Sequence, residues 1–201
     1  MLKFGTLKLG SDQVYGQEIG NILVVRSDDG IAMLLVGTDL KTMYDRMESH
    51  FAGQVLCADQ DAVADDLTGV LAVLSGAAPE SDLPFEYDLQ GTDFQQKVWS
   101  ALAQIPYGQT RTYQEIAIQI GQPTAARAVG TACGANPVVL LVPCHRVLPA
   151  SGEVGNYSCG GPAIKHFLLG HEESMQWKHL TDLATVAGSA TMRPSIDKAV
   201  A

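Results

Sequence analysis

A thiol, an imidazole and a guanidinium follow one another at Cys144, His145 and Arg146, directly after an apolar run that ends at Pro143. The thiolate is the reactive form of cysteine, and a free thiol is mostly protonated at neutral pH, so Cys144 needs a base. His145 is the nearest base in the sequence. Because neighbouring side chains point in different directions in regular structure, we expect His145 to act through a bridging water. The alternative interpretation is that Cys144 is an inert core residue.

Two residues outside this trio can support it. An imidazole that works as a base needs an acceptor on its second nitrogen. Glu172 is the best candidate, because a final helix starting at Pro162 can fold back over the Gly-rich loop at 151–161. Asn136 precedes the apolar run and can hold the cysteine-bearing turn through its amide. Arg146 either forms an internal ion pair with a carboxylate or favours the thiolate as a cation, and we favour the ion pair.

Two classes of function use a cysteine with a histidine. A hydrolase attacks a carbonyl, forms a thioester and turns over. An alkyl transferase attacks a saturated carbon and forms a thioether, which has no carbonyl for water to attack, so the protein is consumed in one turnover. A basic pair of helices upstream of Cys144 has no role in an ordinary hydrolase and favours alkyl transfer.

The spacing of apolar residues predicts the strand and the helices around Cys144. The run from Val138 to Val142 predicts a short buried strand, which would mount the cysteine rigidly. A helix is expected after Thr92 or Asp93, and two short helices are expected at 113–120, capped by Thr112, and at 124–133. A tight turn at 121–123 joins the short helices. This pattern is typical of a helix-turn-helix, although any αα-hairpin gives it.

The N-terminal half predicts a small α/β unit without a cluster of chemical groups. A β-hairpin is expected within 17–36, with strands at 22–25 and 31–36. Amphipathic helices are expected at 39–51, with Thr38 as the cap, and at 61–74, followed by a strand at 84–89. At the other end of the chain, the residues from about 178 onward lack periodicity and predict a loosely held tail.

Composition and charge narrow the class of protein. The net charge is −9, but residues 94–147 carry four basic side chains and one acidic one, a net charge of +3, which leaves −12 on the remainder. A local basic face on an acidic protein can bind phosphates weakly. The sequence shows neither a secretory signal nor a membrane span, and its four cysteines are dispersed. We therefore expect a cytoplasmic protein that needs no metal, cofactor or membrane.

The segment Pro143-Cys144-His145-Arg146-Val147 resembles the active-site signature of the O6-alkylguanine-DNA alkyltransferases, also called methylated-DNA–protein-cysteine methyltransferases. The N-terminal half is similar, more loosely, to the ribonuclease-H-like domain of the bacterial adaptive-response branch, and the C-terminal half to that branch's C-terminal domain. The resemblance of the C-terminal half continues at Gly91 to Trp99, Ile105 to Gly108, Tyr113, Arg127 to Gly130, Asn136-Pro137, Gly155 to Tyr157, Lys165, Leu168-Leu169 and Glu172.

The resemblance implies roles for these residues. Cys144 would accept the alkyl group, His145 would deprotonate it through water, Glu172 would orient the imidazole, and Asn136 would brace the turn. The second helix of the pair would enter the minor groove of DNA, Arg127 would fill the gap left by a flipped base, and Tyr113 would help to rotate the nucleotide. The implied DNA-binding set is Tyr113, Gln114, Ala125, Ala126, Arg127 and Gly130, and the implied base pocket is Val147, Val154, Tyr157 and Ser158.

The resemblance also implies the overall organisation and activity. The fold is expected to be α/β (α+β), with a ribonuclease-H-like domain at 1–90, a winged-helix-like domain with a helix-turn-helix at 91–175, and a tail at 176–201. The expected partner is double-stranded DNA carrying O6-methylguanine, or O4-methylthymine, and the protein is expected to be a monomer. The rival function is a lesion sensor without catalysis, but related non-catalytic proteins carry tryptophan where this chain has Cys144. Cys159 is expected to be either inert or open to oxidation.

Overall fold

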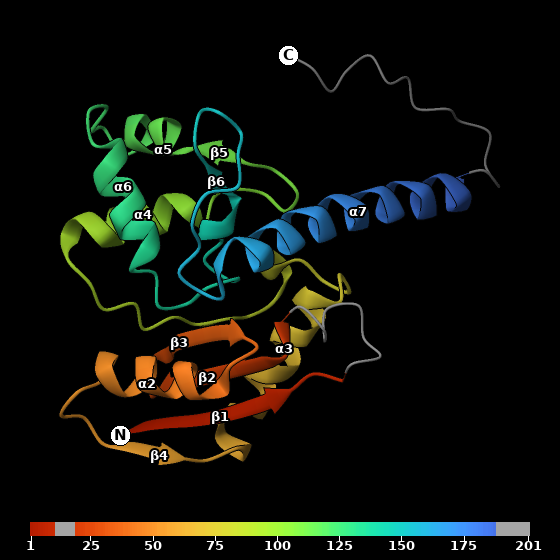
Figure 1. Cartoon of the computed structure of the whole chain (residues 1–201). Coiled ribbons are helices and arrows are strands. Elements are labelled where there is room, and N and C mark those ends of the chain that lie inside the picture. Colours follow the sequence, from red (N-terminus) through yellow and green to blue (C-terminus); the bar gives the residue numbers. More distant parts are fainter. Residues whose placement is uncertain (11–18, 188–201) are drawn as a thin grey trace.

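The computed structural model describes residues 1–10 and 19–187, with side chains described up to Ser174. It is a mixed α/β structure in which an N-terminal sheet with its helices lies beside a mainly helical C-terminal unit (Figure 1). Within the described ranges, no helix is long and apolar enough to cross a membrane.

The N-terminal sheet has four strands in the order β3-β2-β1-β4. The expected hairpin is confirmed as β2 (Asn21–Ser27) and β3 (Gly30–Gly37), paired antiparallel. Sequence periodicity missed β1 (Leu2–Lys8), which pairs antiparallel with β2, and β4 (Leu56–Ala58), which pairs parallel with β1. Every residue of β3 is buried, so this strand is covered on both faces.

Two helices pack on this sheet, as expected. Helix α2 (Leu40–His50) contacts β3, and α3 (Ala64–Leu74), preceded by the 3₁₀-helix η1 (Asp61–Val63), contacts β1 and β2. The predicted cap of the first helix was wrong by one residue. Asp39 caps it, because its carboxylate accepts from the backbone N–H of Lys41 at 3.0 Å.

The C-terminal unit begins with α4 (Asp93–Leu102), followed by the helix pair α5 (Tyr113–Gln119) and α6 (Ala126–Gly134). The short strands β5 (Arg111–Thr112) and β6 (Val147–Leu148) pair in parallel. Thr92 and Thr112 cap α4 and α5 through complete capping boxes with Gln95 and Glu115. The helices predicted here are confirmed, because their caps and apolar faces are both written locally in the sequence.

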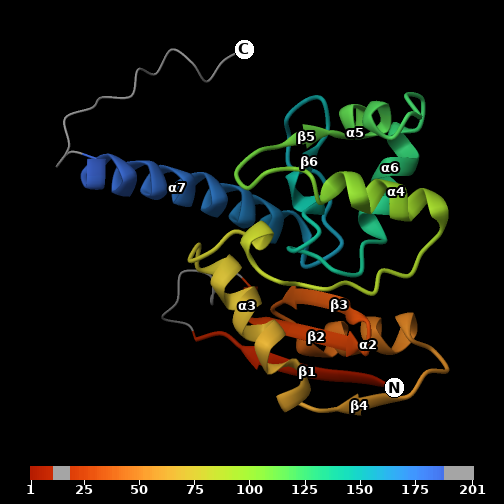
Figure 2. The same ribbon diagram turned by 180° about the vertical axis from the view of Figure 1, so that it is seen from behind.

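The final helix is longer than expected. Helix α7 runs over Gly161–Ala187 and projects away from the rest of the protein in both views (Figures 1 and 2). Residues 178–187, predicted as part of a loosely held tail, are therefore helical, and the helix extends past its expected end near Glu172. The remainder of that tail, 188–201, lies outside the described residues.

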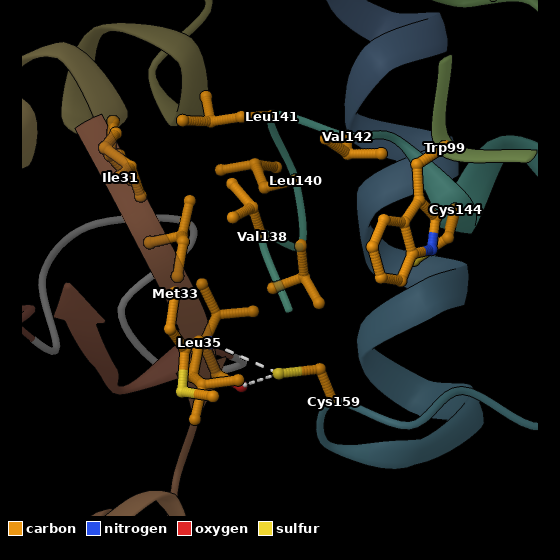
Figure 3. Close-up of a cluster of buried hydrophobic side chains, with 14 of the residues drawn as sticks. Ile31, Met33, Leu35, Trp99, Val138, Leu140, Leu141, Val142, Cys144 and Cys159 are labelled. Atoms are coloured by element: carbon orange, nitrogen blue, oxygen red, sulfur yellow. Dashed lines mark hydrogen bonds between the residues drawn. The ribbon is translucent and has the colours of Figure 1, made fainter. Parts of the chain in front are cut away.

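The prediction of a strand at 138–142 was also wrong. Only Val138 bridges to a strand, at Leu34 of β3, and the following residues form turns in which Leu140 has a φ of 72°. The run is buried throughout and lies between β3 and Trp99 (Figure 3). Burial on all sides gives a strand and a compact turn the same apolar pattern, so periodicity cannot separate them.

The strand predicted at 84–89 reduces to one bridge, between Tyr87 and Ile31. The backbone of Ile31 donates to the carbonyl of Glu86 at 2.8 Å and accepts from the N–H of Asp88 at 3.0 Å. Segment 84–89 then continues as the connection to α4, so the pairing stays short.

Candidate active site

Cys144 begins a 3₁₀-helix, η3 (Cys144–Arg146), and its residue is only 4% exposed. Asn136 holds the turn that carries it. The Asn136 amide donates to the carbonyl of Val142 at 2.7 Å and to the Cys144 Sγ at 3.2 Å, and its Oδ1 accepts from the N–H of Val138 at 3.0 Å. The cysteine is therefore mounted on a side-chain-braced turn rather than on a strand end.

The environment of Cys144 keeps its thiol protonated at rest. Burial raises the pKa of the Cys144 thiol, while the hydrogen bond from Asn136 and the positive charge of Lys165 oppose that rise. A buried thiol reacts only when a base removes its proton at the moment of attack. The neighbouring groups therefore decide whether Cys144 is reactive or inert.

His145 and Glu172 meet in the protein interior. The His145 Nε2 lies 2.7 Å from Oε1 of Glu172, and His145 is fully buried. Burial would raise the pKa of Glu172, but the hydrogen bonds and charges of His145 and Arg146 lower it to about 2. An ionised carboxylate only accepts, so Nε2 of His145 carries a proton in either charge state of the ring. When the imidazole is neutral, its Nδ1 is an acceptor.

The Nδ1 atom of His145 is buried and has no hydrogen-bond partner among the described residues. No direct hydrogen bond joins His145 to Cys144 within this described set. A water between Nδ1 and Sγ would give the imidazole its missing partner and would connect the base to the thiol.

Arg146 lies behind this pair and is fully buried. Its guanidinium bonds both oxygens of Glu172 at 2.9–3.2 Å, the carbonyl of Ile105 at 2.8 Å, and a carboxylate oxygen of Glu80. The internal ion pair expected for Arg146 is confirmed. Glu172 is thus shared between an imidazole and a guanidinium.

A cavity of about 440 Å³ opens in front of Cys144. Four of the residues expected to contact DNA or the base line it: Tyr113, Gly130, Tyr157 and Ser158. Of the other two base-pocket residues expected, Val147 and Val154, neither lines the cavity, and Val147 is fully buried. The complete lining is Tyr113, Gly130, Cys133, Gly134, Cys144, Pro149, Gly155, Asn156, Tyr157, Ser158 and Lys165.

The helix pair forms one wall of this cavity. Helices α5 and α6 pack together, and a Cβ added to Gly130 would meet the Tyr113 ring at 3.8 Å. Arg127 is exposed on α6, with the half-buried Ala125 and Ala126 at the start of the helix. Gln114 is exposed, but its amide donates to the carbonyl of Pro123 at 2.7 Å, which ties the inter-helix turn.

The family model described as "6-O-methylguanine DNA methyltransferase, DNA binding domain" matches residues 93–174. The methylated-DNA–protein-cysteine methyltransferase of Mycobacterium tuberculosis (strain ATCC 25618 / H37Rv) is 46% identical over 142 residues, which cover 71% of this chain and 81% of that protein. The chain belongs to the methylated-DNA–protein-cysteine methyltransferase family.

Further relatives agree with this assignment. The bifunctional transcriptional activator/DNA repair enzyme Ada of Escherichia coli (strain K12) is 38% identical over 148 residues, covering 71% of this chain and 40% of that protein. The crystal structure of Mycobacterium tuberculosis OGT in complex with DNA matches this structure with a TM-score of 0.71. The two sequences are 36% identical, and the match covers 86% of this chain and 94% of that one. The mixed α/β architecture is therefore shared with solved methyltransferases.

Two residues of this methyltransferase site were given no role by sequence reasoning. Lys165 on α7 is 1% exposed, lines the cavity, and donates to the carbonyl of Val147 at 2.7 Å. The sequence placed Lys165 among the residues that carry the family resemblance but gave it no role. Arg46 on α2 donates to the carbonyl of Ser158 at 2.9 Å and to that of Asn136 at 3.3 Å. No local signal connects Arg46 to residues so distant in the sequence.

Cys159 is a structural thiol. Its Sγ lies 3.0 Å from the carbonyl and 3.3 Å from the N–H of Val36 on β3 (Figure 3). Burial raises the pKa of the Cys159 thiol to about 11. Of the two alternatives for Cys159, the structure supports the inert one, with the loop anchored to the N-terminal sheet.

Proposed function

We propose that this protein repairs alkylated DNA by transferring the methyl group of O6-methylguanine in double-stranded DNA to Cys144 in one irreversible turnover. The observation that carries the proposal is the placement of a buried thiol at the base of a cavity, with an oriented imidazole–carboxylate pair behind it. O4-methylthymine offers the same kind of alkyl–oxygen bond and is the second expected substrate.

The proposed transfer is a displacement at a saturated carbon. The bond from Sγ of Cys144 to the methyl carbon forms as the bond from that carbon to O6 breaks. The thiol proton passes through a water to Nδ1 of His145, whose other nitrogen is held by Glu172. The leaving guanine takes up a proton, and the hydroxyl of Tyr113 in the cavity wall is the proposed donor. The thioether has no carbonyl for water to attack, so the protein is consumed.

Access to Cys144 requires that the base leave the DNA helix. An alkyl group inside the base stack is out of reach of a thiol that is 4% exposed at the base of a cavity. The α6 helix is suited to the minor groove because small residues surround its exposed Arg127. In this proposal Arg127 occupies the gap in the stack, and the loop with Tyr157 and Ser158 receives the flipped base.

We also propose that the units at 1–90 and 91–175 are ribonuclease-H-like and winged-helix-like domains, and that the protein acts as a cytoplasmic monomer on DNA. The α5–α6 pair, joined through a turn with Gly121 at a φ of 72°, supports the helix-turn-helix part of this assignment. No metal or cofactor enters the proposed reaction.

Intact-mass analysis after incubation with an O6-methylguanine duplex tests the proposal. The expected result is a gain of one methyl group for one hydrogen, absent with unmodified DNA and absent in Cys144→Ala. Lesion binding without a mass change would instead indicate a sensor. Repeated turnover of an ester substrate would indicate a hydrolase.

A further inference from the structure

The buried guanidinium of Arg146 has two carboxylate partners that come from distant segments of the chain. One is Glu172 on α7, which also binds His145. The other is Glu80, which begins the 3₁₀-helix η2 (Glu80–Asp82) near the end of the N-terminal unit. The proposed mechanism uses Glu172 and leaves Glu80 without a role.

The donors of Arg146 are divided between these partners. Its Nε and NH2 groups bond Glu172, whereas its NH1 group bonds Glu80 and the carbonyl of Ile105. The Tyr107 ring covers the guanidinium, with its centroid 5.3 Å from the central carbon. Because Arg146 is fully buried, its charge is not solvated by water and must be balanced by its carboxylate partners.

The position of Arg146 governs how Glu172 is used. The Oε1 atom of Glu172 accepts from both His145 and Arg146, while its Oε2 accepts from Arg146 and from the N–H of Gly108 at 3.1 Å. If Arg146 lost its partner on the NH1 side, its uncompensated charge would draw Glu172 more strongly. The carboxylate would then be a weaker and less well aligned acceptor for His145.

We propose that Glu80 is a positioning residue of the active site, which holds Arg146 from the side of the N-terminal unit and thereby keeps Glu172 aligned on His145. The inference rests on the proposed alkyl transfer to Cys144. It makes the N-terminal unit a support of the active site, and Glu80 lies outside the matched family segment at 93–174. Glu80 acts through Arg146 and Glu172 and touches neither the cavity in front of Cys144 nor its thiol.

The test compares Glu80→Gln with Asp82→Asn in the full chain. Glutamine keeps an oxygen that accepts from Arg146, so it removes the charge while preserving a hydrogen bond. Asp82 lies in the same 3₁₀-helix and is exposed, so its substitution removes the same charge without touching Arg146. Single-turnover rates at saturating O6-methylguanine duplex, the Kd for that duplex, and the Tm are measured for each variant.

We expect Glu80→Gln to slow methyl transfer by about 5-fold to 50-fold, which lies within the range of coupling energies for residues of one network, with the Kd unchanged. Asp82→Asn should react at the wild-type rate. In a Glu172→Gln background, Glu80→Gln should have no further effect on the rate, because the carboxylate that it positions is gone.

Three results would overturn the inference: a wild-type rate for Glu80→Gln, an equal rate loss in the Glu172→Gln background, or a rate loss that only follows a smaller folded fraction. A failure of the proposed methyl transfer itself would give a different result from a failure of the role of Glu80. In that case the wild-type protein itself would gain no methyl group on Cys144.

Discussion

Replacing Asn136 by alanine removes three hydrogen bonds from the turn that carries Cys144. The substitution leaves the carbonyl of Val142 and the N–H of Val138 buried without their side-chain partner, and the Cys144 sulfur without its donor. Each buried polar group left unsatisfied costs about 1–3 kcal/mol. The carbonyl of Val142 still accepts from the N–H of Cys144 at 2.8 Å, so the N–H of Val138 is the backbone group left unsatisfied. We therefore expect a loss of about 1–3 kcal/mol in the free energy of unfolding.

The same change should slow the reaction of the folded protein. The Asn136 hydrogen bond opposes the effect of burial on the thiol, so its removal raises the pKa of Cys144 further and makes deprotonation harder. Urea unfolding gives the stability, and the single-turnover rate under conditions where the variant is folded gives the chemistry.

Asn156→Ala is the matched control, because Asn156 is an exposed asparagine on the same cavity. We expect its unfolding free energy to stay within about 0.5 kcal/mol of the wild type. A similarly small change for Asn136→Ala, with an unchanged transfer rate, would refute the conclusion that Asn136 braces the turn.

Three further predictions concern the neighbouring residues. Glu172→Gln should slow methyl transfer by at least about 10-fold while leaving the Kd for lesion DNA nearly unchanged, as measured by stopped-flow and titration; a loss of binding would make Glu172 purely structural. Arg127→Ala should slow repair of duplex DNA more than reaction with free O6-benzylguanine, and equal losses would rule out its role in flipping. The pKa of Glu172 is lowered from its ordinary 4.5 to about 2 on folding, so its contribution to stability is present above pH 4.5 and is lost as the pH falls towards 2. Urea titrations across that range should show a steeper loss of stability for the wild type than for Glu172→Gln, and parallel curves would contradict this linkage.

What could be predicted from the sequence was local. The helices starting after Thr92 and Thr112 were placed well, because a capping side chain, its capping-box partner and an apolar face all lie within a few residues. The pairing of His145 with Glu172 was also expected, since the chemistry of a base demands an acceptor, and the structure brings the two within 2.7 Å.

What could not be predicted depends on contacts between distant segments. The run at 138–142 is apolar whether it forms a strand or a turn. The hydrogen bonds of Asn136 and the bridge between Val138 and Leu34 of β3 select the turn. The strand β1 is stabilised by pairing with β2 and β4, which lie further along the sequence. Arg46 and Glu80 belong to the N-terminal unit, so nothing near them in the sequence reveals that they reach the active site.

The transfer to Cys144 in a single turnover is the central claim, and the stoichiometry of methyl transfer measures it most directly. With excess O6-methylguanine duplex, the amount of methyl group transferred should plateau at one per protein molecule. Peptide mapping should place that methyl group on Cys144, with Cys57, Cys133 and Cys159 unmodified. Transfer that continues beyond one equivalent, or a methyl group found on Cys133 in the same cavity, would contradict the account.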